Sequence, residues 1–396
     1  MWQEVKNIYH LLVAVTANIV YRFPSKNMTV VGITGTDGKT TTSFLIYHIL
    51  KTAGKDVSLI STNGAVINGT ISALGFHVTN PASLPLQKFI ARMHKARSGK
   101  KYLVLEVTSH GIDQKRIWGI HFSIAGLTNV THEHLDYHKT YSRYLATKAR
   151  LLQGADIAVI NKDDHSYPKV KKLLENKHNL ITYSLKDNAD ITPETLSYKT
   201  QLTGEYNRSN ILLAIAVSKQ LGIPDEEIQK AIATFKPPVG RAEIVYQKEF
   251  TIMVDFAHTP NALSRILPEA RTMAKSRLIH VFGSAGERDR TKRPIMGKEA
   301  SLYDDIIILT AEDPRKEDVW HIMRDIKKGM AKKKEVLEIP DRQQAITKAI
   351  NMAKKGDFVL LTGKAHEISM NYGRGEEVWN EFEAVKVALQ ERNSNV

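Results

Sequence analysis

The chain has 396 residues and no cysteine, which excludes disulfides, thiolate metal ligands and a cysteine nucleophile. Near its N-terminus it also lacks an apolar segment long enough to cross a membrane. The most apolar stretch there, residues 9–23, is shorter than the ~20 residues that cross a membrane and is interrupted by Thr16 and Asn18. Glu4 precedes this stretch and no small-residue cleavage site is evident, which argues against a signal peptide. We therefore expect a helix that packs on the protein or on a partner, and a cytoplasmic location.

Acidic residues are fewer than basic ones: 42 Asp and Glu against 56 Lys and Arg leave a formal net charge of +14. An excess of positive charge is typical of proteins that bind nucleic acid, an anionic membrane surface or anionic substrates. The lysines are spread along the chain, and no RNA- or DNA-binding signature accompanies the lysine-rich run at residues 327–335. We interpret this run as a solvated helix face. We expect a monomer that binds small molecules rather than nucleic acid.

Short runs rich in Val, Ile and Leu alternate with helical patterns along the chain. This alternation is typical of an α/β protein whose parallel sheets are covered by helices. The runs form two series separated near residues 237–240. The first comprises residues 28–33, 56–62, 101–107, 122–129 and 155–161, and the second comprises residues 251–258, 277–284, 304–313 and 357–367. We therefore expect a helical extension over residues 1–27, one α/β domain over 28–239 and another over 240–396.

Polar segments follow the predicted strands at five places. In open α/β sheets, ligands bind outside the carboxyl ends of the strands. One polar turn carries little weight, but five of them across two sheets predict one ligand cleft between the two domains. These segments are residues 128–129, 255–258, 283–290, 312–315 and 363–367.

The sequence TGTDGKTTT, residues 34–42, links the first predicted strand to an apolar helix. Backbone N–H groups of a glycine turn and of a helix N-terminus stabilise phosphate oxygens. Lys39 can then reach the β- and γ-phosphates, and Thr40 can bind Mg²⁺. The usual P-loop pattern has glycine where this chain has Ile33, so an ordinary strand-to-helix turn is the alternative. We predict phosphate binding.

Two further segments contain candidate metal ligands. Glu106 ends an otherwise apolar strand, where a carboxylate is costly to bury alone, so a metal ion or a cation is expected beside it. A salt bridge at the rim of the sheet is the alternative. The segment TNVTHEHLDYH holds His132, His134 and His138, whose spacing matches no standard zinc motif. One of them suits a Mg²⁺–nucleotide site, and we expect structural or surface roles for His132 and His138.

Together these segments resemble the ATP-dependent Mur ligases, and within that family the muramoyl-tripeptide synthetases. In the family the phosphate loop reads T-G-T-[ND]-G-K-[ST] without an upstream glycine, so Ile33 fits the family's own variant. The resemblance runs in order from residue 28 to residue 367. It includes the segments EVTSHG, YLATKARLL, GEYNRSN, VGRAE, VDFAHTPNAL, FGSAGERDRTKRPIM, EDPR and GKAHE. It implies a P-loop-type, parallel-sheet ATP-binding domain followed by a Rossmann-like domain that binds an amino acid.

The resemblance implies ATP and Mg²⁺ as cofactors. Lys148 matches a lysine that the family carries as a carbamate formed with CO₂, and an anionic side chain there completes a metal site. Arg241 would stabilise charge on the transferred phosphoryl group, because a guanidinium is a fixed cation. Asp255 would accept hydrogen bonds from the ribose. The implied catalytic residues are Lys39, Lys148, Arg241 and His134; the metal ligands are Thr40, Glu106, His134 and Lys148; and the ATP contacts are Thr36, Gly38, Lys39, Thr40, Thr41, Asn207, Asn210, Arg241 and Asp255.

The resemblance to the substrate site is uneven. Asn80 replaces the second threonine of the family's T-T-P segment, and Ala365 replaces a family glycine. Diaminopimelate-adding members read D-N-P-R where this chain reads EDPR. Arg315 can hold a distal carboxylate and Asp313 favours a nearby cationic group, with a surface salt bridge between the two as the alternative. The implied substrate contacts are Thr79, Asn80, Ser109, Gln114, Arg116, Arg288, Asp313, Arg315, Gly363 and Glu367.

The implied reaction is amide formation at a carboxylate, which ATP converts to an acyl phosphate before an amine attacks. Catalysis then relies on positioning and electrostatic stabilisation rather than on a side-chain nucleophile. We expect diaminopimelate or another diamino acid to be joined to a UDP-N-acetylmuramoyl-dipeptide-like acceptor. Only about 27 residues precede the first strand, too few for the family's uridine-binding domain. The alternatives are a Mur-type ligase for another carboxylate, such as an unusual wall peptide or a folylpolyglutamate-like acceptor, and a non-catalytic nucleotide-binding scaffold.

Overall fold

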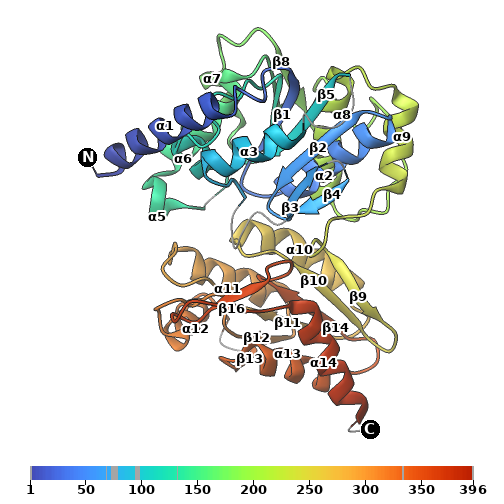
Figure 1. Cartoon of the computed structure of the whole chain (residues 1–396). Helices are drawn as coiled ribbons and strands as arrows, with labels where there is room; N and C mark the ends of the chain where they lie inside the picture. The colour runs from blue at the N-terminus through green and yellow to red at the C-terminus, as the bar shows by residue number, and fades with distance from the viewer. Residues whose placement is uncertain are drawn as a thin grey trace. The chain divides into compact units, whose positions relative to one another are not determined.

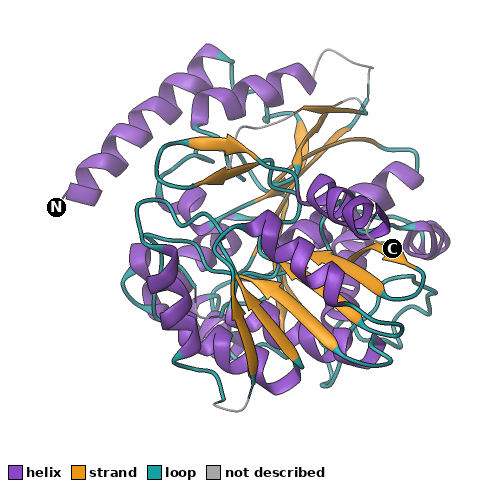
Figure 2. Cartoon of the chain, turned by 90° about the horizontal axis from the view of Figure 1, so that it is seen from below, coloured by secondary structure: helices purple, strands orange, loops and turns teal. Residues whose placement is uncertain are grey.

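The computed structural model describes residues 2–67, 69–72, 79–93, 99–131, 133–331 and 334–394. The chain divides into two compact units, each with helices on both sides of a sheet (Figure 1; Figure 2). Unit 1 comprises residues 1–131 and 138–238, and unit 2 comprises residues 132–137 and 239–396. The predicted α/β class with parallel sheets is confirmed.

Unit 1 is built on an eight-stranded sheet with the order β4-β3-β2-β5-β1-β6-β7-β8. Strands β3 and β4 are antiparallel at one edge, and the other strands run parallel. The chain first adds strands on the β5 side of β1 and then on its β6 side, so the carboxyl end of β1 is a topological switch point, where such sheets bind ligands. The strands are β1 (Met28–Thr34), β2 (Asp56–Ser61), β3 (Gly64–Ile67), β4 (Thr70–Ser72), β5 (Lys101–Glu106), β6 (Ile124–Leu127), β7 (Ile157–Asn161) and β8 (Leu180–Tyr183).

Helices cover both faces of this sheet. Because successive strand residues point to opposite faces, Val31 and Ile33 join the core under α2, α8 and α9, whereas Val30 joins the core under α3 and α6. The helices of unit 1 are α1 (Trp2–Val20), α2 (Lys39–Thr52), α3 (Ser83–Met93), α4 (Ser109–Asp113), α6 (Tyr141–Gly154), α7 (Tyr167–Leu173), α8 (Glu205–Gln220) and α9 (Asp225–Thr234), and the short α5 (Leu135–His138) begins in unit 2 and ends at His138.

Unit 2 is built on a six-stranded sheet with the order β13-β12-β11-β14-β10-β9, in which β9 is an antiparallel edge strand. Alanines and isoleucines of α13 pack on one face together with α14. The elements are β9 (Glu243–Gln247), β10 (Thr251–Asp255), α10 (Pro260–Met273), β11 (Leu278–Phe282), α11 (Lys292–Tyr303), β12 (Ile306–Leu309), α12 (Val319–Lys327), β13 (Glu335–Glu338), α13 (Arg342–Met352), β14 (Phe358–Thr362), β15 (Ser369–Asn371), β16 (Glu376–Val378) and α14 (Glu381–Ser394).

Every predicted strand is present, with shifts of a few residues at its ends. One prediction is wrong. The lysine-rich run at residues 327–335 is not a helix face, because α12 ends at Lys327 and the run lies mostly beyond it, with Lys332 and Lys333 outside the described residues. The predicted N-terminal helix is α1. Among the described residues, no helix is both long and apolar enough to cross a membrane.

Candidate active site

The phosphate loop joins β1 to α2 at the switch point of the unit 1 sheet. Gly35 and Gly38 have φ angles of 149° and 83°, which favour glycine. Neighbouring side chains also exclude a Cβ atom: at Gly35 it would lie 1.8 Å from Thr128 Oγ1, and at Gly38 it would lie 2.4 Å from Asn210 Oδ1. The glycines therefore let the loop pack closely beneath the N-terminus of α2, whose first N–H groups suit an anion.

The carboxyl end of β6 holds this loop in place. Thr128 Oγ1 donates to the backbone oxygen of Asp37 over 2.6 Å. The amide of Asn129 donates to that same oxygen over 3.0 Å and accepts from the Asp37 N–H over 3.1 Å. The N–H of Thr36 donates to the backbone oxygen of Asn129 over 2.9 Å. The polar segment at residues 128–129 thus positions the loop.

Lys39 and Thr36 both lie against the loop. Lys39 Nζ donates to the backbone oxygen of Thr36 over 2.8 Å, so the ammonium folds back over the loop. The Thr36 hydroxyl lies 3.1 Å from the Tyr144 hydroxyl and accepts from the Thr131 N–H over 3.0 Å. Thr41 is buried in the first turn of α2. The predicted ATP contacts of Thr36, Lys39 and Thr41 stay predictions, but all three lie within one short segment.

Glu106 ends β5 with its side chain buried, at 1% exposure. Thr40 Oγ1 lies 3.1 Å from both carboxylate oxygens, and the N–H and hydroxyl of Thr62 donate to them over 3.0 Å each. Within the described part of the chain Glu106 forms no ion pair, so the alternative of a rim salt bridge is wrong. A buried carboxylate held only by neutral donors, next to a phosphate loop, suits a divalent cation.

Lys148 lies on α6 behind the phosphate loop. Its side chain is buried, and its Nζ donates to the backbone oxygen of Gly35 over 2.6 Å. Burial lowers the pKa of Lys148 well below its usual value, Lys39 lowers it further, and nearby carboxylates oppose the shift. Because the neutral amine is favoured, Lys148 is suited to nucleophilic attack.

The predicted metal ligands are divided between the units. Thr40 and Glu106 are in contact in unit 1, and Lys148 interacts electrostatically with Glu106 there. His134 has a φ of 57° and lies in the segment that groups with unit 2. Across the described ranges, no three His, Asp or Glu side chains gather in a cluster that could hold a metal ion. Among the predicted ligands in the described part of unit 1, the two that are in contact offer a cation one carboxylate and one hydroxyl.

Two other predicted positions are structural in character. His138 is buried, lies 3.0 Å from the hydroxyl of Ser109 and packs against Tyr144 with ring centroids 5.2 Å apart. This agrees with the structural role expected for His138. Ser109, a predicted acceptor contact, is also buried at the start of α4. His132 lies outside the described residues.

Asn207 and Asn210 lie in the first turns of α8. Asn207 Nδ2 donates to the backbone oxygen of Thr203 over 2.7 Å, and Asn210 Nδ2 donates to Asn207 Oδ1 over 3.3 Å. Asn210 Oδ1 is the atom that a side chain at Gly38 would meet, so α8 abuts the phosphate loop. The structure thus places Asn210 against the loop, with Asn207 bonded to it, and the ATP contacts of both residues stay predictions.

Asn80 braces the predicted acceptor segment. Its Nδ2 donates to the backbone oxygen of Glu106 over 2.7 Å, and its Oδ1 accepts from the N–H and hydroxyl of Thr108 over 2.7 and 2.9 Å. Arg116 donates to the backbone oxygen of Asn80 over 2.5 Å and to Gln114 Oε1 over 2.9 Å. The asparagine that replaces the family threonine is thus a link between β5 and the turn after α4. Thr79, beside it, shares a 2.8 Å hydrogen bond with the Thr62 hydroxyl.

In unit 2, Asp255 and Arg241 lie together. Asp255 ends β10, and its two oxygens accept from the N–H groups of Ala257 and Ala242, over 2.7 Å each. Burial raises the pKa of Asp255, and the adjacent Arg241 and the two N–H groups oppose that rise. The Arg241 guanidinium lies 4.5 Å from the ring centroid of Phe256. These are the two residues predicted to contact ribose and phosphate.

Arg288 and Arg315 form a positive pair in unit 2. Burial lowers the pKa of Arg288 and the neighbouring Arg315 lowers it further, while Asp136, Glu133 and Asp313 oppose the shift. Arg315 has a φ of 54° and its Nη1 donates to the backbone oxygen of Gly286 over 2.7 Å. Two adjacent guanidinium groups repel each other, and a substrate carboxylate would relieve that repulsion.

Lys364 is the cation beside Asp313. Its buried Nζ lies 2.9 Å from both Asp313 oxygens and 2.7 Å from Glu367 Oε2. The N–H of Asn371 donates to Asp313 Oδ1 over 2.9 Å. The prediction that Asp313 favours a nearby cation is therefore satisfied within the chain itself. The alternative of a surface salt bridge between Asp313 and Arg315 is wrong, because Asp313 is buried and pairs with Lys364.

Glu312 is a buried carboxyl next to these groups. Burial raises the pKa of Glu312 to about 8, although Lys292 and Arg342 oppose the rise. In the described part of the chain its Oε2 has no hydrogen-bond partner. A Cβ at Gly363, whose φ is 104°, would lie 2.4 Å from that oxygen, so this glycine leaves room for the carboxyl. Ala365, where the family has glycine, has a φ of 39°, which L side chains rarely adopt.

Two residues that contact the buried carboxylates were not predicted from the sequence. Thr62 supplies two of the donors to Glu106, and Lys364 neutralises Asp313. Thr62 carried a signal, because it follows an apolar strand at the same edge of the sheet as Glu106. Lys364 stood in the quoted segment GKAHE, but a single lysine in a sequence carries no sign of its burial.

Comparison with known proteins identifies the class. The family model described as the Mur ligase middle domain matches residues 33–218. The model described as the Mur ligase, glutamate ligase domain matches residues 240–365. The chain therefore belongs to the Mur ligases, which are ATP-dependent, ADP-forming ligases.

Within that family the chain is similar to proteins named as diaminopimelate ligases or as tripeptide synthetases. The UDP-N-acetylmuramoyl-L-alanyl-D-glutamate–2,6-diaminopimelate ligase of Aquifex aeolicus is 39% identical over 363 residues, which is 87% of this chain and 74% of that protein. The UDP-N-acetylmuramyl-tripeptide synthetase of Borreliella afzelii is 37% identical over 407 residues, covering 94% of this chain and 79% of that protein. A solved structure of a UDP-N-acetylmuramoyl-L-alanyl-D-glutamate–2,6-diaminopimelate ligase superposes with a TM-score of 0.61 at 30% identity, covering 93% of this chain and 80% of the other.

Proposed function

We propose that the chain is an amide ligase that uses ATP to add diaminopimelate, or another diamino acid, to a UDP-N-acetylmuramoyl-dipeptide-like acceptor. This is a step of peptidoglycan precursor synthesis. One observation carries the proposal: the phosphate loop, the buried carboxylate of Glu106 and the buried amine of Lys148 lie together at the switch point of unit 1. The named relatives support the choice of acceptor and amino acid.

The reaction overcomes the low reactivity of a carboxylate toward an amine. An oxygen of the acceptor carboxylate attacks the γ-phosphorus of ATP, ADP leaves and an acyl phosphate forms. The amino nitrogen then attacks the carbonyl carbon, inorganic phosphate leaves and the nitrogen loses a proton. The N-terminus of α2 and Lys39 stabilise the phosphate charge, and no side chain becomes a nucleophile toward the substrate.

Thr40 and Glu106 are the side chains that would hold Mg²⁺ in unit 1. Their hydroxyl and carboxylate oxygens are of the type that Mg²⁺ prefers, and the hydrogen bond between them supports the proposal that both contact one ion. A bound Mg²⁺ would neutralise charge on the phosphates. Glu106 would then exchange the Thr40 hydroxyl for the ion, while the two Thr62 donors keep the carboxylate oriented.

Lys148 would supply a second anion as a carbamate. The neutral amine attacks the carbon of CO₂, an N–C bond forms and one proton is lost, which leaves a single negative charge. Burial supports this step because it favours the neutral amine. A carbamate would give a divalent ion beside Glu106 a second negative ligand. The carbamate and the part played by His134 are proposals.

The charged groups of unit 2 suit an amino acid with ionic groups at both ends. Arg288 and Arg315 would bind its distal carboxylate, and Glu367 would accept from its ammonium group. Asp313 contributes less to charge selection than the sequence suggested, because Lys364 already neutralises it. A cytoplasmic location and a monomeric state stay predictions. So does a partner at α1, whose Ile8, Leu12 and Ile19 are 61, 61 and 62% exposed.

ADP release tests this function. The purified chain is mixed with ATP, Mg²⁺ and UDP-N-acetylmuramoyl-L-alanyl-D-glutamate, and diaminopimelate, lysine, ornithine and alanine are added singly. We expect release that depends on both acceptor and amino acid, with a diamino acid preferred and with Lys39→Met inactive. Amino-acid-dependent release only with another acceptor would replace the proposed substrate, and no release with any pair would contradict ligase activity.

A further inference from the structure

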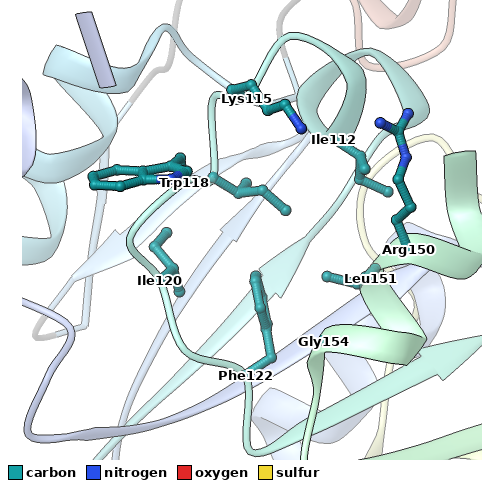
Figure 3. A pocket seen from close by; sticks show the side chains of 9 residues that line it. Ile112, Lys115, Trp118, Ile120, Phe122, Arg150, Leu151 and Gly154 are labelled. Atoms are coloured by element: carbon teal, nitrogen blue, oxygen red, sulfur yellow. The ribbon is translucent and has the colours of Figure 1, made fainter. Parts of the chain in front are cut away.

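A pocket of about 200 Å³ lies in unit 1 between the turn that follows α4 and the C-terminal half of α6 (Figure 3). Its apolar lining includes Ile120, Phe122 and Leu151, and Trp118 lies at its edge with 38% of its surface exposed. The pocket is smaller than the roughly 300–1,000 Å³ of sites for drug-sized ligands, and it suits one planar ring. Neither the proposed chemistry nor the predicted substrate contacts use it.

Two cations reach this apolar pocket. In Figure 3 the charged ends of Lys115 and Arg150 point to the same side of it. Arg150 forms a salt bridge with Asp113 Oδ1 over 2.8 Å, which offsets part of its charge, and donates to the Thr147 hydroxyl over 3.0 Å, so its guanidinium is held in place. Within the described residues, Lys115 forms no ion pair. An apolar ring site with two cations at one side matches a ligand that is aromatic at one end and anionic next to it.

Lys115 occupies a position where glycine is the usual residue. The N–H of Arg116 donates to the oxygen of Gly111 over 2.9 Å, and the N–H of Lys115 donates to the oxygen of Ile112 over 3.2 Å. These two hydrogen bonds form a Schellman motif at the end of α4. In this motif the residue at the Lys115 position adopts the left-handed backbone conformation and is most often glycine. Lys115 has a φ of 55°, so the chain accepts a strained lysine there.

The pocket adjoins residues already assigned to the acceptor. Lys115 lies between Gln114 and Arg116, which the resemblance assigns to acceptor binding. Leu151 and Gly154 lie on α6 three and six residues after Lys148, so the pocket begins within about 9 Å, measured along the helix, of the lysine that contacts the phosphate loop. The pocket therefore lies on the same helix as the lysine that contacts the phosphate loop, next to a segment predicted to bind the acceptor.

More positive charge gathers beside the same segment. Burial lowers the pKa of His10 on α1, and the cations Arg116 and Lys6 lower it further, which places these two cations near a neutral imidazole. Helix α1 is fixed there by two hydrogen bonds, from Asn7 to Asp113 over 3.3 Å and from Asn18 to the backbone oxygen of Trp118 over 2.8 Å. Lys6 and Arg116 therefore add positive charge near the segment that lines the pocket.

We propose that this pocket binds the nucleotide end of the acceptor, with a pyrimidine base against Trp118 and the apolar side chains and the diphosphate on Lys115 and Arg150. The inference rests on the proposed function, because it assigns a place to one part of the same acceptor. An indole beside an apolar floor stacks with a base, and a guanidinium together with an ammonium binds phosphate oxygens. The chain thereby holds the acceptor at both ends.

Binding of UDP alone tests the pocket independently of catalysis. The full chain is titrated with UDP, and tryptophan fluorescence and calorimetry are recorded for the wild type, Trp118→Leu and Lys115→Gly. We expect Trp118→Leu to abolish the fluorescence change and to weaken binding about tenfold, whereas Trp320→Leu, which removes an exposed tryptophan of unit 2, changes neither. No saturable UDP binding, or equal affinity in the wild type and Trp118→Leu, would overturn the proposal.

Lys115→Gly separates binding from folding. Glycine is the better residue for a left-handed turn, so we expect this variant to raise the Tm by about 2–4 °C and yet to weaken UDP binding about tenfold. The matched variant Lys172→Ala, at an exposed lysine of α7, should leave UDP binding unchanged. A more stable Lys115→Gly variant with unchanged UDP affinity would overturn the assignment of Lys115.

A kinetic comparison distinguishes failure of this site from failure of the proposed function. Trp118→Leu should raise KM for the UDP-linked acceptor and leave KM unchanged for the same muramoyl-dipeptide without its nucleotide. Equal effects on the two acceptors would overturn the site while the ligase activity stands. If neither acceptor supports ADP release, the proposed function fails, and the UDP titration still decides whether the pocket binds a nucleotide.

Discussion

Lys148 Nζ donates to the backbone oxygen of Gly35 over 2.6 Å, so a buried lysine on α6 contacts the backbone of the phosphate loop. The bond requires a hydrogen on the nitrogen, which both an amine and a carbamate N–H possess. A carbamate would add two oxygens and a negative charge on the side where Glu106 already interacts with this lysine. The hydrogen bond is therefore compatible with both the amine and the carbamate of Lys148. Only the carbamate would place a negative charge beside the loop.

Replacing Lys148 by alanine tests that state. We expect Lys148→Ala to reduce turnover at least about a hundredfold, because the metal loses an anionic ligand, and to regain part of it in the presence of formate or acetate. Steady-state ADP release measured with and without these carboxylates gives the answer. The exposed Lys172→Ala variant is the control. Full activity of Lys148→Ala in the absence of added carboxylate would refute the carbamate.

Glu106→Gln removes a charge and keeps the shape of the side chain. The amide oxygen can still accept from the Thr62 N–H, and a threonine hydroxyl can accept from the amide NH₂, so we expect a folded protein whose Mg²⁺ concentration for half-maximal ADP release rises about tenfold or more. Glu226→Gln, at an exposed position on α9, should leave this concentration unchanged. An unaltered Mg²⁺ requirement in Glu106→Gln would show that the carboxylate does not hold the ion.

Asp313→Asn tests the buried pair with Lys364. It leaves the Lys364 ammonium with Glu367 as its remaining carboxylate, so we expect about 3 kcal/mol less stability and a higher KM for the amino acid with an unchanged KM for ATP. Denaturant unfolding and steady-state kinetics measure the two effects. Glu383→Gln, which breaks an exposed pair with Lys386, should have almost no effect. A KM for ATP that rises in parallel would indicate general damage instead.

Glu312 predicts a pH dependence of stability. Its pKa is 4.5 in the unfolded chain and about 8 in the folded one, so between these values the folded state holds a proton that the unfolded state has lost. Stability therefore falls as pH rises from about 4.5 to 8 and is unaffected by this group outside that window. We expect Glu312→Gln to raise the Tm at pH 8 relative to the wild type and to change it little at pH 4.5. Equal shifts at both pH values would place the ionisation elsewhere.

Much of the fold and of the candidate site was readable from the sequence. Apolar runs marked the parallel strands because buried strands need apolar residues on both faces, and the loop at residues 34–42 carried its own glycine pattern. The antiparallel edge strands β4 and β9 were missed because short edge strands leave little periodic signal. The pairing of Asp313 with Lys364 was missed for another reason. It joins residues 51 positions apart, and no local pattern records such a contact.

The transfer of oxygen tests the central claim most directly. The acceptor is prepared with ¹⁸O in its reacting carboxylate, and the inorganic phosphate released during amide formation is analysed by mass spectrometry. If the carboxylate is activated as an acyl phosphate, one ¹⁸O atom per turnover passes from the acceptor to phosphate, and release depends on the amino acid. Phosphate that contains no ¹⁸O while amide accumulates would contradict carboxylate activation by phosphoryl transfer.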